Sequence, residues 1–473
     1  MLKDSFKEFA DAIAVNVQKL TVDGTETEEQ SDDSDKDDPK MLSRYYRIVN
    51  KLNDTYWQED DDQDHGHIIG SLGRKTAIKG ISDMDMLFVL PSEVKKDFDS
   101  REGNVQSKLL QEVKGRIKEI YPNTIVRGDG QVVVVSMKSA KCEIEVCPVF
   151  ERTDGAFDYP DSNDGGRWKK TNPIPEATES EIMIDLTNAH YQNVCRIIRA
   201  WKNNKGFKFG GLLIDTLVYN FFKDERYIHY QECDFDSYLQ LFIDLFKYLK
   251  DQDANKKYWL ALGSRQHVYK SNSKFITRAK KAYNKLNGCT EEDDNIYELL
   301  QDVFGTAFPA PTLITKTSSA TASFSKSFSN TEESITNMFS VDIRYELEID
   351  CEVDLSGYRR KSLREMLRNT LQLPARKTLT FKITYNEFEE KYKKIRVDDQ
   401  KNYNSYRVYW KVLNRGSEAR SRDCIRGQIR SGKETKVEVT SFKGKHIVEC
   451  YIVHDNVVVA KDRILVPIDP SAI

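Results

Sequence analysis

Apolar residues recur at helical spacing in two stretches near the start of the chain. Residues 2–20 carry one such stripe and residues 41–57 another, each long enough for an amphipathic helix that packs on a folded body. Residues 22–38, which lie between them, are mostly acidic or small polar, with too few apolar side chains to offset the entropy of ordering. The pattern therefore predicts two helices joined by a flexible acidic loop.

The pattern then changes to short buried strands. Residues 68–90 indicate a turn followed by a strand that ends at Pro91, and a helix is expected over residues 104–120. Further strands are expected over residues 125–127, 132–137 and 142–149. This alternation of strands and helices predicts a mixed α/β region.

A mainly helical region follows. Helical spacing of apolar residues predicts helices over residues 189–205, 211–223, 235–251, 274–286 and 295–303. A segment rich in Ser, Thr and Pro comes next and is typical of a linker. Beyond it, apolar and polar residues alternate as in strands, which predicts a mostly β C-terminal domain.

These patterns divide the chain into five segments. The expected segments are an N-terminal helix and acidic loop at 1–40, a mixed α/β core at 41–175, a helical lobe at 176–306, a linker at 307–334 and a mostly β domain at 335–473. A chain of 473 residues exceeds what one hydrophobic core usually organises, which agrees with several compact units.

Composition excludes several classes of protein. No apolar run approaches the roughly 20 residues that a bilayer crossing needs, and the N-terminus lacks the apolar core of a secretory signal. The eight cysteines show no paired CxxC spacing, which argues against a zinc site or a disulfide framework. We therefore expect a cytoplasmic protein with no membrane partner. The formal net charge of −3 requires any phosphate chemistry to be local.

The strongest chemical signal lies in residues 70–85. A Gly-Ser turn that begins at Gly70 and Ser71 is followed by Asp83 and Asp85 on a predicted strand. Because strand side chains alternate between faces, the two carboxylates share one side while Met84 and its apolar neighbours point into the core. Two adjacent carboxylates repel each other unless a cation lies between them, and hard oxygen ligands favour Mg²⁺, with Mn²⁺ as the alternative.

A third carboxylate and a phosphate cradle complete the hypothesis. Glu145 lies on another alternating strand and is the favoured third ligand, with Glu143 on the same face as the alternative. Main-chain N–H groups around Gly70, Ser71 and Gly73 would hold a triphosphate tail. The guanidinium of Arg74 could bridge phosphate oxygens.

With these residues, the chain resembles the nucleotidyltransferase superfamily of cyclic GMP-AMP synthase, oligoadenylate synthase and the bacterial second-messenger synthetases of antiphage signalling. The resemblance covers residues 40–305 and implies a polymerase-beta type fold with a helical second lobe. It also implies that Asp83, Asp85 and Glu145 hold the metal and are catalytic, although the family often has Asp at the third position. In the helical lobe, the resemblance implies that Arg199 and Lys202 bind nucleotide.

The C-terminal region also resembles a known domain. The stretch from Tyr406 to Gly416, with Arg426–Ile429 and Gly444–Tyr451, is similar to the sensor domain found after adenylyl/guanylyl cyclases and such bacterial synthetases. This implies an activating ligand or protein at the C-terminal domain and a nearby-encoded effector that reads the product. Two aromatic groups remain open to interpretation. Tyr409, Trp410 and Tyr451 form a core or a stacking pocket, and Trp168 lies in an interlobe turn or lines a base-binding cleft.

The leading hypothesis is synthesis of a cyclic or linear oligonucleotide messenger from nucleoside triphosphates, with release of pyrophosphate. One alternative is transfer of nucleotides to tRNA or to a protein. Another is a catalytically silent module that senses a nucleotide. The sequence leaves open the bases, the linkage and size of the product, the activating signal and the oligomeric state.

Overall fold

The computed structural model describes most of the chain. The described residues are 1–15, 39–80, 83–137, 142–310, 332–354, 361–369, 373–398, 406–422, 424–440 and 443–469. The predicted acidic loop and most of the predicted linker lie outside these ranges. In the part of the chain that is described, no helix is long and apolar enough to cross a membrane.

The chain forms two compact units. The first unit comprises Met1–Ala200, Gly210–Ser271 and Ile276–Pro309. The second unit comprises Trp201–Phe209, Asn272–Phe275 and Ala310–Ile473. The boundary between them falls inside one helix, α7 (His190–Lys205), immediately after Ala200.

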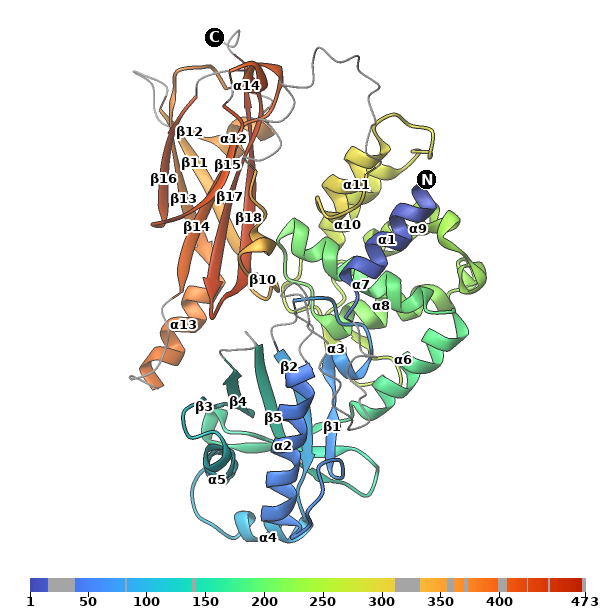
Figure 1. Cartoon of the computed structure of the whole chain (residues 1–473), viewed down its shortest axis with the longest axis vertical. Coiled ribbons are helices and arrows are strands. Elements are labelled where there is room, and N and C mark those ends of the chain that lie inside the picture. The colour runs from blue at the N-terminus through green and yellow to red at the C-terminus, as the bar shows by residue number, and fades with distance from the viewer. Residues whose placement is uncertain are drawn as a thin grey trace, which may run out of the picture. The chain divides into compact units, whose positions relative to one another are not determined.

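A seven-stranded mixed sheet organises the N-terminal part of the first unit (Figure 1). Its strand order is β1-β2-β5-β4-β3, and β6 and β7 extend it from β5. The central strand β2 (Asp83–Val89) runs parallel to β5 (Cys142–Glu151). The other strands are β1 (Gly66–Ile68), β3 (Ile125–Asp129), β4 (Val132–Met137), β6 (Phe157–Asp161) and β7 (Arg167–Thr171).

Helices α2 (Pro39–Tyr56) and α5 (Val105–Ile120) pack on one face of this sheet. Their apolar stripes meet the inward side chains of the strands, among which Met84 and Met86 have no exposed surface. Asp83 and Asp85 alternate with these methionines and are half-buried on the opposite face. The predicted alternation on this strand is confirmed. Two short helices complete the region: α3 (Gly70–Gly73) and α4 (Ser92–Asp99).

Of the two interpretations of Trp168, the interlobe turn is wrong, and the base-binding cleft stays a prediction. Trp168 lies on β7, which pairs with β6. Its indole N–H donates a hydrogen bond to Asp99 Oδ1 (2.9 Å), and its ring meets Phe150 edge-on. The strand was missed because charged residues flank the tryptophan and hide any alternation.

The rest of the first unit is mainly helical, as predicted. The N-terminal helix α1 (Leu2–Ile13) packs on this region through Phe6 and Phe9, whose rings contact Phe304 and Phe308. A two-stranded hairpin, β8 (Tyr258–Leu260) and β9 (His267–Tyr269), interrupts the helices. The helices are α6 (Ile174–Leu186), α7, α8 (Gly211–Lys223), α9 (Tyr238–Lys250), α10 (Phe275–Leu286) and α11 (Ile296–Phe304).

The second unit is mostly β, as predicted. One sheet has the order β10-β18-β17-β14-β15 and the other β12-β11-β13-β16, and a shared apolar core joins them. Trp410 and Tyr451 are almost fully buried, which favours the core interpretation over a stacking pocket. The strands are β10 (Ser340–Val341), β11 (Leu347–Asp354), β12 (Lys361–Ser362), β13 (Thr378–Asn386), β14 (Arg407–Leu413), β15 (Arg426–Gly432), β16 (Thr435–Val439), β17 (Gly444–His454) and β18 (Val457–Ile468). The helices are α12 (Leu363–Arg368), α13 (Glu387–Asp398) and α14 (Ser417–Ser421).

Candidate functional site

Three carboxylates converge on the open face of the seven-stranded sheet. Asp83, Asp85 and Glu145 each offer one oxygen, and these oxygens lie within 4.8 Å of one another. The parallel register explains the convergence, because Asp85 on β2 lies directly opposite Glu145 on β5. All three side chains are half-buried. Three negative charges this close are unfavourable without a cation, so the arrangement fits a divalent metal with oxygen ligands.

The fourth carboxylate on this face, Glu143, is held by a different partner. Arg127 on β3 contacts it with both ends of its guanidinium, from Nη1 to Oε1 (2.8 Å) and from Nη2 to Oε2 (3.1 Å). The Ser136 hydroxyl donates to the same Oε1 (2.7 Å). Such a two-pronged ion pair fixes the orientation of Glu143. Of the two alternatives that the sequence left open, Glu145 is the one in the carboxylate cluster, and its role as third ligand stays a prediction.

Gly70 lies against the cluster and has a left-handed backbone, with φ = 67°. A Cβ atom at this position would come within 2.0 Å of Asp85 Oδ2. The main chain of this turn is also tied to the strand, because Ile69 N donates to Asp85 O (2.9 Å). Only glycine fits both the conformation and the space. The Gly-Ser element is therefore part of the wall of the site.

The two other predicted turn residues also shape the main chain. A Cβ atom on Gly73 would lie 2.5 Å from the carbonyl oxygen of Ile68, so this position too requires glycine. The carbonyl oxygen of Ser71 accepts hydrogen bonds from the N–H groups of Thr76 (2.9 Å) and Ala77 (3.1 Å). These contacts fold the chain back after α3. Nucleotide binding by Gly70, Ser71 and Gly73 stays a prediction.

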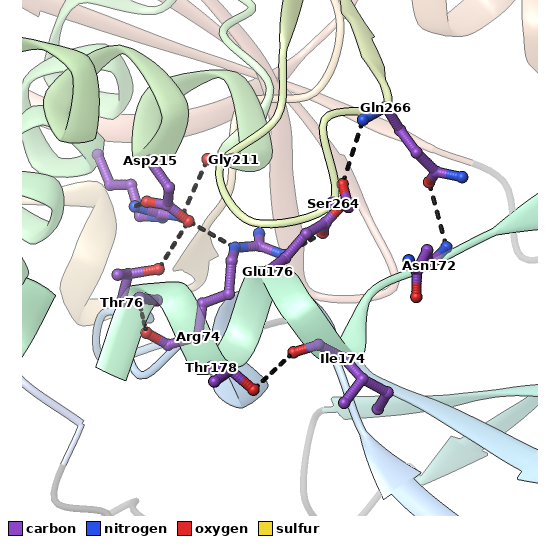
Figure 2. Close-up of polar contacts among 12 residues, drawn as sticks. Arg74, Thr76, Asn172, Ile174, Glu176, Thr178, Gly211, Asp215, Ser264 and Gln266 are labelled. Carbon is purple, nitrogen blue, oxygen red and sulfur yellow. Dashed lines mark hydrogen bonds and ion pairs between the residues drawn. The ribbon is translucent and has the colours of Figure 1, made fainter. Parts of the chain in front are cut away.

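A buried ion network lies directly behind the turn (Figure 2). Asp215 on α8 is fully buried and accepts hydrogen bonds from Arg74 Nε (2.8 Å), Thr76 Oγ1 (2.9 Å) and both Nη atoms of Arg199 (2.6 and 2.8 Å). Arg74 Nη1 also reaches Glu176 Oε2 at 3.6 Å. Burial by itself would raise the pKa of Asp215, but the charges of Arg199 and Arg74 outweigh it and lower that pKa to about 2.

Side chains from two neighbouring helices hold the same segment through its main chain. Ser180 Oγ on α6 donates to the carbonyl oxygen of Arg74 (2.7 Å). On α7, Gln192 Nε2 donates to Lys75 O (2.6 Å) and Arg196 Nε to Ala77 O (3.1 Å). The segment after the Gly-Ser turn is thus fixed by three helices of the lobe, which the sequence spacing could not show.

The basic residues predicted to bind nucleotide occupy different surroundings. Arg74 and Arg199 are buried and pair with Asp215. Lys202 belongs to the second unit, where its ammonium contacts Asp342 Oδ1 (2.9 Å) and the carbonyl oxygen of Ile343 (2.8 Å). Their contacts give them a structural role, and nucleotide binding by them stays a prediction.

Cys147, two residues after Glu145 on the same face of β5, is buried in an apolar cluster with Leu87 and Phe157. Burial, with the nearby charges of Glu145 and Asp85, raises the pKa of its thiol to about 12. The thiol therefore stays protonated at neutral pH and contributes no charge to the cluster.

Two family models match separate parts of the chain. The model of the Second Messenger Oligonucleotide or Dinucleotide Synthetase domain (SMODS) matches residues 32–182, which contain all three carboxylates. The model of the Adenylyl/Guanylyl and SMODS C-terminal sensor domain matches residues 329–469. The predicted pairing of synthetase and sensor domains is confirmed. The seven-stranded sheet lies in the synthetase region, and the two packed sheets lie in the sensor region.

The individual proteins to which the chain is similar share a low sequence identity with it. A probable cyclic nucleotide synthase of Bacillus cereus (strain VD146) is 21% identical over 218 residues, which are 40% of this chain and 63% of that protein. The structure of the E. coli MS115-1 CdnC:HORMA-deltaN complex is 16% identical, covers 65% of this chain and 98% of that one, and has a TM-score of 0.46. The structure of the Vibrio cholerae di-nucleotide cyclase is 11% identical, with coverage of 65% and 87% and a TM-score of 0.43.

Proposed function

We propose that this chain is a Mg²⁺-dependent nucleotidyltransferase that joins nucleoside triphosphates into a cyclic or linear oligonucleotide messenger and releases pyrophosphate. One observation carries the proposal. Asp83, Asp85 and Glu145 converge within 4.8 Å inside the region that matches the synthetase model. The domain combination favours a role in antiphage signalling, in which a nearby-encoded effector reads the product and the sensor region takes an activating ligand or protein.

The three carboxylates fit a hard divalent cation. Their oxygens are the donors that Mg²⁺ prefers, and Mn²⁺ would accept the same set. When bound, such an ion neutralises phosphate charge and favours ionisation of the attacking ribose hydroxyl. The chain itself orients these carboxylates through the β2–β5 register and keeps Glu143 apart through Arg127.

The Gly-Ser turn supplies the other half of the proposed site. Gly70 allows the main chain to pass close to Asp85, where N–H groups of the turn would face a triphosphate. Asp215 and its arginines hold the following segment in place, so the turn does not need to be ordered by the substrate. Binding to a turn that is already fixed avoids the entropy cost of ordering it.

The experiment incubates the purified chain with all four radiolabelled ribonucleoside triphosphates and Mg²⁺ and resolves phosphatase-resistant products. The Asp83→Ala/Asp85→Ala variant is the control, and it should lose the product entirely because two of the three proposed ligands are gone. A resistant product that persists in this variant would contradict the proposal. Label transferred instead to tRNA or protein in added lysate would favour the alternative substrate class.

A further inference from the structure

The hairpin formed by β8 and β9 presents an unusual outer face. Tyr258, Leu260 and Tyr269 are 40%, 40% and 59% exposed, and His267 is exposed beside them. The register explains why they share one face, because Tyr258 lies opposite Tyr269 and Leu260 opposite His267. Apolar side chains scattered singly on a surface are ordinary, whereas a contiguous group can mark an interaction site.

The rings form a compact group. Tyr258 and His267 stack with centroids 3.7 Å apart and an interplanar angle of 20°. Tyr269 lies 6.0 Å from Tyr258 and 6.1 Å from His267. The result is a small aromatic platform whose outer surface can accept a further flat ring.

The charge of the hairpin is entirely positive. Residues 256–270 contain Lys256, Lys257, Arg265 and Lys270 and no aspartate or glutamate, although the whole chain has a net charge of −3. Lys256, Lys257 and Arg265 are exposed. Aromatic rings with interspersed cations are the combination that binds single-stranded nucleic acid, because bases stack on the rings and phosphates meet the cations.

The platform is rigid before any ligand arrives. Beneath it, Trp259 is 3% exposed and donates its indole N–H to Gln252 Oε1 (3.0 Å). In the hairpin turn, Ser264 Oγ donates to Glu176 Oε1 (2.8 Å), and Gln266 Oε1 accepts from Asn172 N (3.1 Å), as Figure 2 shows. Fixed rings lose little entropy when a base stacks on them.

We propose that the outer face of the β8–β9 hairpin docks single-stranded nucleic acid. This surface lies outside the carboxylate site, and binding to it does not depend on nucleotidyl transfer. Its turn is nevertheless anchored to Glu176, which contacts Arg74 in the network behind the Gly-Ser turn. A strand bound at the hairpin therefore rests on the same scaffold that holds the synthetase site.

The test measures anisotropy of fluorescein-labelled oligo(U) and oligo(dT) of about 20 nucleotides, long enough for one stacking site. The full chain should bind both, and binding should weaken as salt rises from about 50 to 200 mM. Tyr258→Ala/Tyr269→Ala should weaken binding at least about tenfold because it removes two stacking surfaces. Lys257→Gln/Arg265→Gln should lower the salt slope by about 0.7 for each phosphate that the variant no longer neutralises.

Two controls make the outcome decisive. Tyr385→Ala removes a tyrosine that is 38% exposed on β13 and should leave binding unchanged. Asp83→Ala/Asp85→Ala should also bind normally, which separates this proposal from the enzymatic one. The proposal is overturned by an absence of binding at low salt, by unchanged binding in the tyrosine variant, or by equal binding of a duplex. Self-association that the tyrosine variant abolishes would assign the face to a second copy instead.

Discussion

At the scale of single residues, the choice between two neighbouring glutamates defines the site. Glu143 and Glu145 lie on the same face of β5, and period-two reasoning cannot separate them. The structure separates them by their partners, since Arg127 holds Glu143 while Glu145 joins the two aspartates. The assignment of Glu145 as the proposed metal ligand rests on its place in the carboxylate cluster.

This distinction predicts different effects of two matched substitutions. Glu145→Gln should reduce kcat for pyrophosphate release at least roughly 100-fold, because a metal ligand contributes several kcal/mol to the transition state. Glu143→Gln should stay within a few-fold of wild type, since an amide oxygen can still accept from Arg127. Initial rates at saturating nucleotide test both. Equal losses would mean that Glu143 also acts in the site.

Gly70 gives a second prediction at this scale. Gly70→Ala should lower activity by at least about 100-fold, because the new Cβ would displace the Asp85 carboxylate from a position 2.0 Å away. Gly115→Ala is the control: Gly115 lies on α5 with open space around it, and this change should stabilise the helix by about 0.5–1 kcal/mol. Rates and urea unfolding of both variants would show the contrast. Full activity in Gly70→Ala would contradict the close contact between the main chain at Gly70 and the Asp85 carboxylate.

At the scale of elements, helices far apart in sequence hold one short segment. α6, α7 and α8 each contribute a side chain that binds the chain between Arg74 and Ala77. The fully buried Asp215 accepts hydrogen bonds from Arg74, Thr76 and Arg199, which makes it the centre of the network. Its charge is offset by Arg74 and Arg199, so removing it leaves two buried cations without their shared partner.

We expect Asp215→Asn to destabilise the first unit by about 3–5 kcal/mol, as the loss of one partner of a buried ion pair usually does. The pKa of Asp215 is lowered to about 2 in the folded state, from an ordinary value of 3.8. The stabilisation is therefore fully present above about pH 4 and is lost as the pH falls toward 2. Urea unfolding of wild type and variant should differ by a constant amount above pH 4.5. A difference that grew between pH 5 and 8 would contradict this.

The sequence predicted those parts of the site that depend on local periodicity. The alternation of Asp83, Met84 and Asp85 is visible in the sequence because a strand has a period of two. The role of Asp215 was not visible, because its partner Arg74 lies 141 residues away and only tertiary packing brings them together. One local signal did exist, since a lone aspartate within the apolar sequence of α8 must find a partner when buried.

At the scale of the whole molecule, the proposed catalytic site belongs to one of two compact units. The sequence predicted the order of a mixed α/β region, a helical region and a mostly β region. It did so because the spacing of apolar residues changes from helical to alternating where helices give way to strands. The assignment of Trp201–Phe209 to the second unit did not follow, because residues 201–205 continue the helical pattern of α7.

A ligand should therefore stabilise the molecule through its first unit. Mg²⁺ with a nonhydrolysable nucleoside triphosphate at about 100 times its Kd should add about 2.7 kcal/mol, which corresponds to a rise in Tm of about 4 °C for a unit of this size. Asp83→Ala/Asp85→Ala should abolish the rise, and EDTA should reverse it in the wild type. Differential scanning calorimetry tests this. An equal rise in the variant would place the nucleotide elsewhere.

The buried thiol of Cys147 has a consequence for chemical durability. Burial is the main cause that raises the pKa of this thiol, so the neutral form dominates at pH 7. Peroxides and alkylating reagents react with thiolates, so Cys147 is a poor target for them while the protein is folded. Alkylation of Cys147 should therefore be slow in the folded protein and fast once unfolding exposes the thiol.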